Sequence, residues 1–476
     1  MKLILKNLGA IQQTSEIDLE KRLMMFVGYN NSGKTYVSQL VWYIFRELRN
    51  DLKLENYITE KDIEEDFKNF ELDIEPIIQN FQSILKEKGL DFLGLTDKNT
   101  ILELKDTFFE KEYKFGLSFL HNNKVAYEVV KNANSFILNI GKKLENSDIK
   151  LYSAQFIALK HSQDWIRTTL SFNDINLVGL NNFINDCIWT IFSIVVKDNY
   201  QNLTFLPATR SFLPSYYKYL VDGFVKERKE ISESIRKNPE NIEKIKQLSR
   251  KRHTSAADDL LDKLNDLSKN SFINKTYTDL IKDLENIMQG SILVENFEGI
   301  AFPEFAFKID EKTNLEMYQT STSVNQLTML YLYLKYWTRE SHNFLIMDEP
   351  EENLHPENQI KLLDILVKFA DRDNNRVLIT THSPLMAKAL NNHIHISYLQ
   401  ENKIADIEKI IHENNLSISP NHLGSQDYGV YFFDGEKVRN YQMTDFGVFF
   451  KDFKEAENKV NDTSNILKSI IHESKS

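Results

Sequence analysis

The chain has 476 residues, of which 42% are hydrophobic, enough to bury the cores of two or three domains or of one domain with a large insertion. Its 58 basic and 69 acidic residues give a net charge of -11, which argues against a nucleic-acid footprint over the whole surface but allows a local basic stripe. The single cysteine, Cys187, excludes an internal disulfide framework and a cysteine-rich metal site, and we expect it to be a small buried apolar residue.

The amino terminus, Met1–Lys6, lacks the apolar centre and the cleavage site of a signal peptide. The best membrane candidate, Ile188–Val196, falls far short of the roughly 20 residues that a spanning helix needs. We therefore expect no membrane contact and a cytoplasmic protein.

Residues 1–48 have the pattern of the first half of an α/β core. Met1–Lys6 and Thr14–Leu19 are short and β-prone, and Leu23–Val27 is the continuous apolar run of a buried strand. A glycine loop follows, and then a helix is predicted from Thr35 to about Leu48.

Residues 49–290 are mostly charged, glycine-poor and helically periodic, which predicts a large and mainly helical insertion. Tyr127–Ile149 is ambiguous between helix and strand. Asn202–Pro207 is ambiguous as well, and one interpretation of Thr204–Pro207 is a strand that ends at its proline.

Residues 291–410 return to alternating strand and helix patterns, which predicts the second half of the same core. The tail, 411–476, is predicted as a separate α/β segment with short strands such as Gly429–Phe433 and a final charged helix. The fold class is thus α/β, with a core whose two halves are separated by the insertion.

The glycine loop carries the strongest motif. Residues 28–35 are Gly-Tyr-Asn-Asn-Ser-Gly-Lys-Thr, a full match to G-x-x-x-x-G-K-[ST] between a strand and a helix. Such a loop turns backbone N–H groups toward phosphate oxygens, and the helix start favours an anion. Lys34 is expected to reach the β- and γ-phosphates of ATP, and Thr35 to bind Mg²⁺. The predicted nucleotide contacts are Gly28, Asn30, Asn31, Ser32, Gly33, Lys34 and Thr35.

A pair of carboxylates ends the apolar run Asn343–Met347. At the carboxyl end of a buried parallel strand, side chains line the crevice where α/β proteins bind ligands. We expect Asp348 to hold Mg²⁺ and Glu349 to act as the general base toward water.

The sequence from Asp348 to Pro356, Asp-Glu-Pro-Glu-Glu-Asn-Leu-His-Pro, resembles the Walker B and D-loop stretch of bacterial ABC-like AAA ATPases, the group of the OLD proteins and of the RecF and SMC heads. Val377–Pro384 resembles their next strand and histidine switch, in which His382 contacts the γ-phosphate. The resemblance covers roughly residues 1–47, 200–215 and 290–400. It implies an ABC/SMC-type P-loop ATPase head with Lys34, Glu349 and His382 as catalytic residues and with ATP held between two heads.

The signature segment departs from the family pattern. The corresponding stretch begins at Thr320, and Ser323 stands in place of its usual glycine. Ser321, Thr322 and Ser323 could supply hydroxyls and a helix N-terminus to the ATP of a partner head. The alternative is a plain helix N-cap.

Phe205–Arg210 resembles a proline–arginine segment of many of these ATPases. In that interpretation Arg210 faces nucleotide or an interface. A structural salt bridge is an equally good alternative.

The resemblance implies a sensor or regulator subunit of an anti-phage defence system, of the Septu or PARIS type, that is a homo-oligomer and acts with a separate nuclease or toxin. The acidic residues of the tail, Asp427, Asp434 and Glu436, form no recognisable metal cluster, so we expect no intrinsic nuclease. The main alternative is a RecF-like repair or recombination ATPase that binds DNA, and a transporter subunit is a weaker one.

A basic surface would discriminate between these functions. The densest basic segment lies between residues 244 and 253, but acidic residues follow it at once, so we favour a solvated helix face over a nucleic-acid contact. Its charged residues are Lys244, Lys246, Arg250, Lys251, Arg252 and His253.

Overall fold

The computed structural model describes residues 1–48, 69–73, 75–97, 99–105, 113–119, 124–131, 135–140, 154–158, 166–170, 202–216, 255–267, 271–295, 303–420, 422–441, 443–444 and 447–473. The chain forms two compact units. Their residues are Met1–Leu8, Glu16–Glu20 and Tyr43–Asn199 for the first, and Gly9–Ser15, Lys21–Trp42 and Tyr200–Ser476 for the second.

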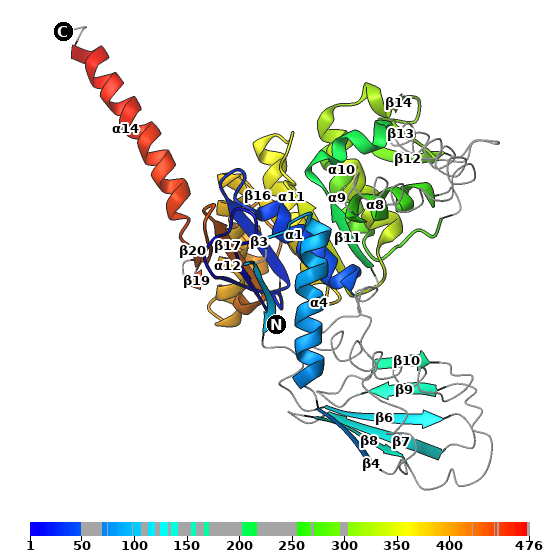
Figure 1. Cartoon of the computed structure of the whole chain (residues 1–476). Coiled ribbons are helices and arrows are strands. Elements are labelled where there is room, and N and C mark those ends of the chain that lie inside the picture. The colour runs from blue at the N-terminus through cyan, green and yellow to red at the C-terminus, as the bar shows by residue number, and fades with distance from the viewer. Residues whose placement is uncertain are drawn as a thin grey trace, which may run out of the picture. The chain divides into compact units, whose positions relative to one another are not determined.

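The second unit is built on a six-stranded sheet in which all neighbouring strands are parallel except the last pair (Figure 1). The strand order is β11 (Asn202–Leu206), β15 (Asn343–Asp348), β16 (Arg376–Thr381), β3 (Leu23–Gly28), β17 (Tyr428–Phe433) and β18 (Val438–Asn440). Every residue of β3, β15, β16 and β17 is buried, as expected for parallel strands covered on both faces. The two halves of the predicted core meet where β3 pairs with β16.

The sheet extends beyond the core boundaries predicted from the sequence. β17 and β18 come from the tail after residue 410, and β11 comes from within the predicted insertion. β11 ends at Leu206, directly before Pro207, as its sequence indicated.

Helices supply much of the core around this sheet. Leu23, Met25 and Val27 of β3 belong to one apolar cluster with residues of several helices. Among these helices are α9 (Thr278–Met288), α10 (Thr322–Leu332), α11 (Pro356–Asp371) and α12 (Pro384–Glu401). On the alternate face of β3, the ring of Phe26 lies 5.0 Å from that of Phe433, centroid to centroid.

Smaller elements complete the second unit. An antiparallel meander is formed by β12 (Ser291–Glu295), β13 (Glu304–Lys308) and β14 (Asn314–Glu316), and a hairpin by β19 (Met443–Thr444) and β20 (Gly447–Val448). The other helices are α1 (Lys34–Arg46), which crosses the boundary between the units, η2 (Ala208–Phe212), α8 (Ser255–Asn265), η4 (Met317–Gln319), η5 (Tyr333–Trp337), α13 (Ile407–Glu413), η6 (Ser425–Asp427) and α14 (Lys451–Glu473).

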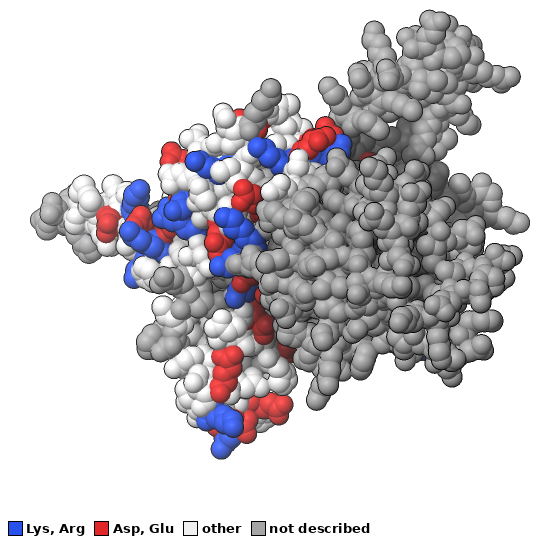
Figure 2. All heavy atoms as spheres, turned by 60° about the horizontal axis from the view of Figure 1, so that its bottom comes forward, with Lys and Arg blue, Asp and Glu red and all other residues white. Residues whose placement is uncertain are grey.

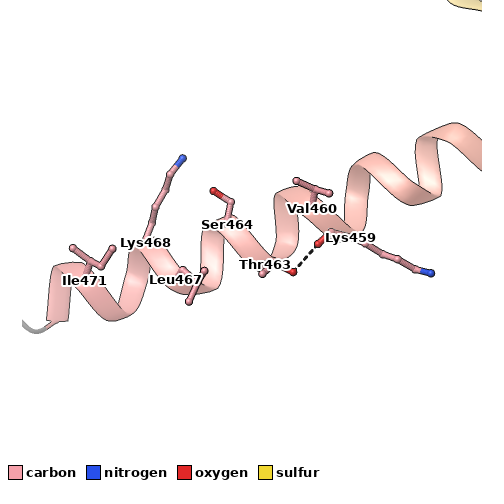
Figure 3. A pocket seen from close by; sticks show the side chains of 7 residues that line it. All are labelled: Lys459, Val460, Thr463, Ser464, Leu467, Lys468 and Ile471. Carbon is pink, nitrogen blue, oxygen red and sulfur yellow. Dashed lines mark hydrogen bonds between the residues drawn. The ribbon is translucent and has the colours of Figure 1, made fainter. Parts of the chain in front are cut away.

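Helix α14 is held to the second unit near its start. The Tyr441 hydroxyl donates to Asp452 at 2.6 Å, and Lys388 pairs with Glu457. Further along, Val460, Leu467 and Ile471 lie on the exposed stretch drawn in Figure 3.

The first unit contains two sheets. β2 (Ser15–Asp18), β1 (Lys2–Lys6) and β5 (Ile101–Lys105) form one, and α4 (Glu75–Leu93) is joined to β5 by hydrogen bonds between the side chain of Gln82 and the backbone of Leu104. The other is an antiparallel six-stranded sheet (Figure 1). Its strand order is β10 (Ile166–Leu170), β9 (Ala154–Ala158), β6 (Tyr113–Phe119), β7 (Lys124–Lys131), β8 (Ser135–Ile140) and β4 (Asn69–Asp73).

This antiparallel sheet differs from the mainly helical insertion predicted for residues 49–290. Lys124–Lys131 and Ser135–Ile140 are rich in β-branched and aromatic residues, and each strand has a neighbour to complete its hydrogen bonds. The ambiguous stretch from Tyr127 is therefore a strand at its start. Cys187 and the basic segment from Lys244 to His253 lie outside the described residues.

Among the described residues, every helix is too short or too polar to cross a bilayer.

Candidate active site

The carboxyl ends of β3, β15 and β16 lie side by side. Asp348 on β15 pairs in register with Thr380 on β16, and Thr381 pairs with Val27 on β3. Side chains that follow these strands therefore gather at one edge of the sheet, the usual ligand-binding edge of an open α/β fold.

The phosphate loop leaves β3 at Gly28, a position that only glycine fits. Its φ is +146°, and a Cβ there would lie 2.1 Å from the carbonyl oxygen of Phe433 on β17. Gly33 and Asn31 also have positive φ, at 99° and 61°. Asn30 and Asn31 are exposed, whereas Ser32 is buried and donates to the carbonyl of Tyr29 at 2.7 Å. The shape of the loop thus depends on residues that tolerate a left-handed backbone.

Lys34 begins α1 with its ammonium turned back over the loop. Nζ donates to the carbonyls of Tyr29 at 2.8 Å and Gly28 at 3.2 Å, and the residue is only 4% exposed. Burial lowers the pKa of Lys34 to about 8, against the opposing effect of nearby carboxylates, of which Glu349 contributes most. A phosphate group would give this ammonium a negatively charged partner in place of neutral carbonyls.

Thr35 and Asp348 bring two oxygen ligands together. The Thr35 hydroxyl donates to the Asp348 carboxylate, 3.0 Å from Oδ2, and the hydroxyl of Thr380 donates to Oδ1 of the same group. Asp348 is only 4% exposed, so these hydroxyls fix its orientation. A hydroxyl and a carboxylate are the hard oxygen donors that Mg²⁺ prefers.

Glu349 follows Asp348 in an uncommon backbone conformation. Its φ is +45°, and its N–H donates to the carbonyl and to the hydroxyl of Thr380 at 3.1 and 3.2 Å. Burial raises the pKa of the Glu349 carboxyl, and the charge of Asp348 adds to this, while Lys34 opposes it. The side chain reaches His382, with Oε1 3.3 Å from Nε2.

Glu351 holds the loop that carries His382. Its Oε1 accepts from the Thr381 hydroxyl at 2.6 Å and from the backbone N–H groups of His382 and Ser383 at 2.8 and 3.1 Å. Burial lowers the pKa of His382, and the ammonium of Lys34 lowers it further. The imidazole is therefore neutral at neutral pH and carries one proton that it can donate.

Arg210, in η2, is fully buried behind the acidic pair. Its guanidinium donates to the carbonyl oxygens of Asp348 at 2.6 Å, Glu349 at 3.0 Å and Pro207 at 3.0 Å. The sequence indicated two roles for Arg210, contact with nucleotide or an interface, and a structural salt bridge. In the structure its hydrogen-bond partners are backbone carbonyls of its own chain, so the role is structural but the partners are not the carboxylates of a salt bridge.

A family model described as an AAA ATPase domain matches residues 1–387, which is most of the chain. The chain belongs to the AAA ATPase domain family. No curated protein matches it.

Solved structures similar to this AAA ATPase include heads of SMC proteins. A structure of an Smc head bound to the C-terminal winged-helix domain of ScpA has 13% identity and a TM-score of 0.35, over 95% of this chain and 98% of that one. A Pyrococcus furiosus Smc head with an extended coiled coil has 11% identity and a TM-score of 0.31, over 97% and 98%. The Thermotoga maritima SMC head has 10% identity and a TM-score of 0.27, over 82% and 90%.

The serine segment of the ATPase caps α10. The Ser321 hydroxyl accepts from the N–H of Val324 at 3.3 Å and lies 2.8 Å from the Ser323 hydroxyl. Ser321 and Thr322 are exposed. Within the described residues no hydrogen bond joins this segment to Lys34 or Glu349.

Two residues of the site were not assigned roles from the sequence, and a third, Arg210, was assigned different ones. Glu351 and Thr380 lie inside the motifs, but only the strand register shows that they hold His382 and Asp348. Arg210 was noted as part of a motif, yet its carbonyl partners are 138 and 139 residues away in the sequence.

Proposed function

We propose that this ATPase binds ATP with Mg²⁺ at the carboxyl edge of its sheet and hydrolyses it to ADP and phosphate. The observation that carries the proposal is the convergence of Thr35, Asp348 and Glu349, from α1 and β15, beside the phosphate loop. These residues are far apart in the sequence, and each has the chemistry that phosphoryl transfer requires. Their meeting at one place is therefore poorly explained by chance.

Binding depends on the phosphate loop. Lys34 exchanges its two carbonyl partners for β- and γ-phosphate oxygens, which are better acceptors because they are charged. The N–H groups of the loop and the start of α1 add to the attraction for the anion. Thr35 and Asp348 would hold Mg²⁺, which neutralises phosphate charge when it is bound.

Hydrolysis depends on Glu349. Its carboxylate accepts a proton from water. Because its pKa is raised above that of an ordinary glutamate, Glu349 is a stronger base than an ordinary glutamate and its pKa lies closer to neutral pH. His382 lies 3.3 Å from this carboxylate and, as a neutral donor, orients it while presenting its ring to the γ-phosphate.

Two copies would complete the site. The exposed hydroxyls of Ser321 and Thr322 and the start of α10 are suited to a phosphate, and no hydrogen bond commits them to the chain's own Lys34–Glu349 group in the described residues. We therefore propose an ATP-linked dimer in which this segment of one head faces the nucleotide of the other.

The biological role that we propose is regulation of a separate effector in anti-phage defence, which rests on the motif resemblance. The alternative, a RecF-like DNA-binding ATPase, needs a basic surface. On the face shown in Figure 2, basic and acidic side chains of the described residues are interleaved. The net charge of -11 favours a protein partner over DNA.

Two measurements separate these roles. DNA binding with a steep salt dependence, lost when Lys244, Lys246, Arg250, Lys251 and Arg252 are replaced by alanine, would support the repair function. A nuclease or toxin encoded beside this gene that co-purifies with the chain would support the defence function. Turnover of ATP that requires Lys34 and Glu349 tests the underlying chemistry in either case.

A further inference from the structure

Arg210 is a buried cation with no direct contact to solvent. It is 0% exposed, and burial lowers its pKa to about 10, so it stays charged at neutral pH. A buried charge is costly unless strong partners surround it. Here those partners are the consecutive carbonyls of Asp348 and Glu349.

The conformation of the backbone at these two carbonyls determines the direction in which the side chains of Asp348 and Glu349 point. Glu349 has a φ of +45°, a conformation that a non-glycine residue keeps only when its surroundings impose it. Its N–H is held by Thr380 and its carbonyl by Arg210. The guanidinium therefore fixes one side of the backbone turn that sends the Glu349 side chain toward His382.

Arg210 also contacts α10, the helix that begins at the serine segment. Gln326 is fully buried, and with its amide oxygen facing the guanidinium it accepts from Nη2 at 2.6 Å and from Nη1 at 3.3 Å. One residue earlier, the Asn325 amide donates to the Thr320 hydroxyl at 2.9 Å and to the carbonyl of Ser321 at 3.3 Å. The serine segment and Arg210 thus contact consecutive residues of α10, Asn325 and Gln326.

We propose that Arg210 is a positioning residue that orients Glu349 for hydrolysis and, through Gln326, links that orientation to the serine segment of the same chain. The proposal rests on ATP hydrolysis at this site. A serine segment that is ordered by the nucleotide of a second copy would then favour the hydrolytic position of Glu349 in its own chain. Two ATP sites in a dimer would be coupled by this route.

The first test replaces Arg210 by lysine, which keeps the charge but cannot bridge two carbonyls with a planar fork. We expect the dissociation constant for ATP to stay within about twofold and kcat to fall by on the order of tenfold to a hundredfold, because small displacements of a catalytic group have effects of that size. Equal losses of affinity and kcat, or an unchanged kcat, would overturn the proposal. A parent protein that does not hydrolyse ATP would overturn the proposed function instead.

The second test keeps Arg210 and remains decisive if Arg210→Lys does not fold. In Gln326→Leu the acceptor on α10 is lost, and we expect unchanged ATP affinity with a lower kcat. Ser323→Ala is then made in the parent and in Gln326→Leu. The coupling requires that Ser323→Ala lowers kcat in the parent and has a smaller effect in the Gln326→Leu background. The same factor in both backgrounds would contradict the link through Gln326.

Discussion

The hydroxyl of Thr35 lies 3.0 Å from Oδ2 of Asp348, although 313 residues separate the two in the sequence. One follows the phosphate loop and the other ends a strand of the opposite half of the core. Their meeting depends on the placement of β3 beside β16 and of β16 beside β15. The sheet order therefore assembles the candidate Mg²⁺ ligands from both halves of the split core.

Lys34→Ala should abolish ATP binding, because it removes the cation that faces the phosphates. We expect a rise of at least about a hundredfold in the dissociation constant, as the loss of a charge-assisted contact to phosphate implies. Titration with a fluorescent ATP analogue measures it. Lys361→Ala, which removes an exposed lysine on α11, is the matched control and should bind normally. Normal affinity in a folded Lys34→Ala protein would show that the phosphate loop is assigned wrongly.

Asp348→Asn should raise the Mg²⁺ concentration needed for half-maximal hydrolysis. The amide keeps the size of the side chain and can still accept from Thr35, but it loses the negative charge that attracts the cation. A Mg²⁺ titration at fixed ATP measures the shift. An unchanged midpoint, with hydrolysis still dependent on Mg²⁺, would place the cation on other residues.

The pH profile of kcat/KM should have two limbs set by Glu349 and Lys34. Glu349 works as the carboxylate, so activity falls as the pH drops through its pKa, which lies above the ordinary value of 4.5. Lys34 works as the ammonium, so activity falls again as the pH rises through about 8. Lys34→Arg should move the alkaline limb to higher pH, because arginine stays protonated. An alkaline limb that does not move would exclude Lys34 as its cause.

Glu351→Ala should destabilise the fold and lower hydrolysis. It removes the acceptor of the Thr381 hydroxyl and of the His382 N–H, and one of the two acceptors of the Ser383 N–H; each buried donor left unpaired costs about 1–3 kcal/mol. Glu351→Gln keeps an amide oxygen as acceptor and is the matched control. Urea unfolding measures the difference between the two variants. Equal stability would show that Glu351 does not hold the His382 loop.

The local chemistry of the site could be predicted from the sequence, but its long-range supports could not. The phosphate loop and the acidic pair each follow an apolar strand, so a motif and its setting lie in one short segment. The contact of Arg210 with Asp348 depends on β11 pairing with β15, and no local pattern specifies that pairing. Glu351 likewise needs the position of the next strand to reveal its three donors.

The fold shows the same division. The apolar runs of β3, β15 and β16 predicted buried strands. Tyr428–Phe433 was predicted as part of a separate tail, whereas it is β17 of the core sheet, because strand order is decided by tertiary packing. The insertion was predicted as mainly helical because its charged stretches have a helical period. Strands such as Lys124–Lys131 are stabilised by pairing with neighbouring strands, which a local pattern does not show.

The central claim, that Glu349 activates water for ATP hydrolysis at this site, is tested most directly by Glu349→Gln. The amide preserves the shape of the side chain but cannot accept the proton, so we expect normal ATP affinity and a kcat lower by on the order of a hundredfold or more. The variant should then accumulate as an ATP-bound dimer, seen by light scattering with and without ATP. A Glu349→Gln protein that turns over ATP at the parent rate would contradict the account.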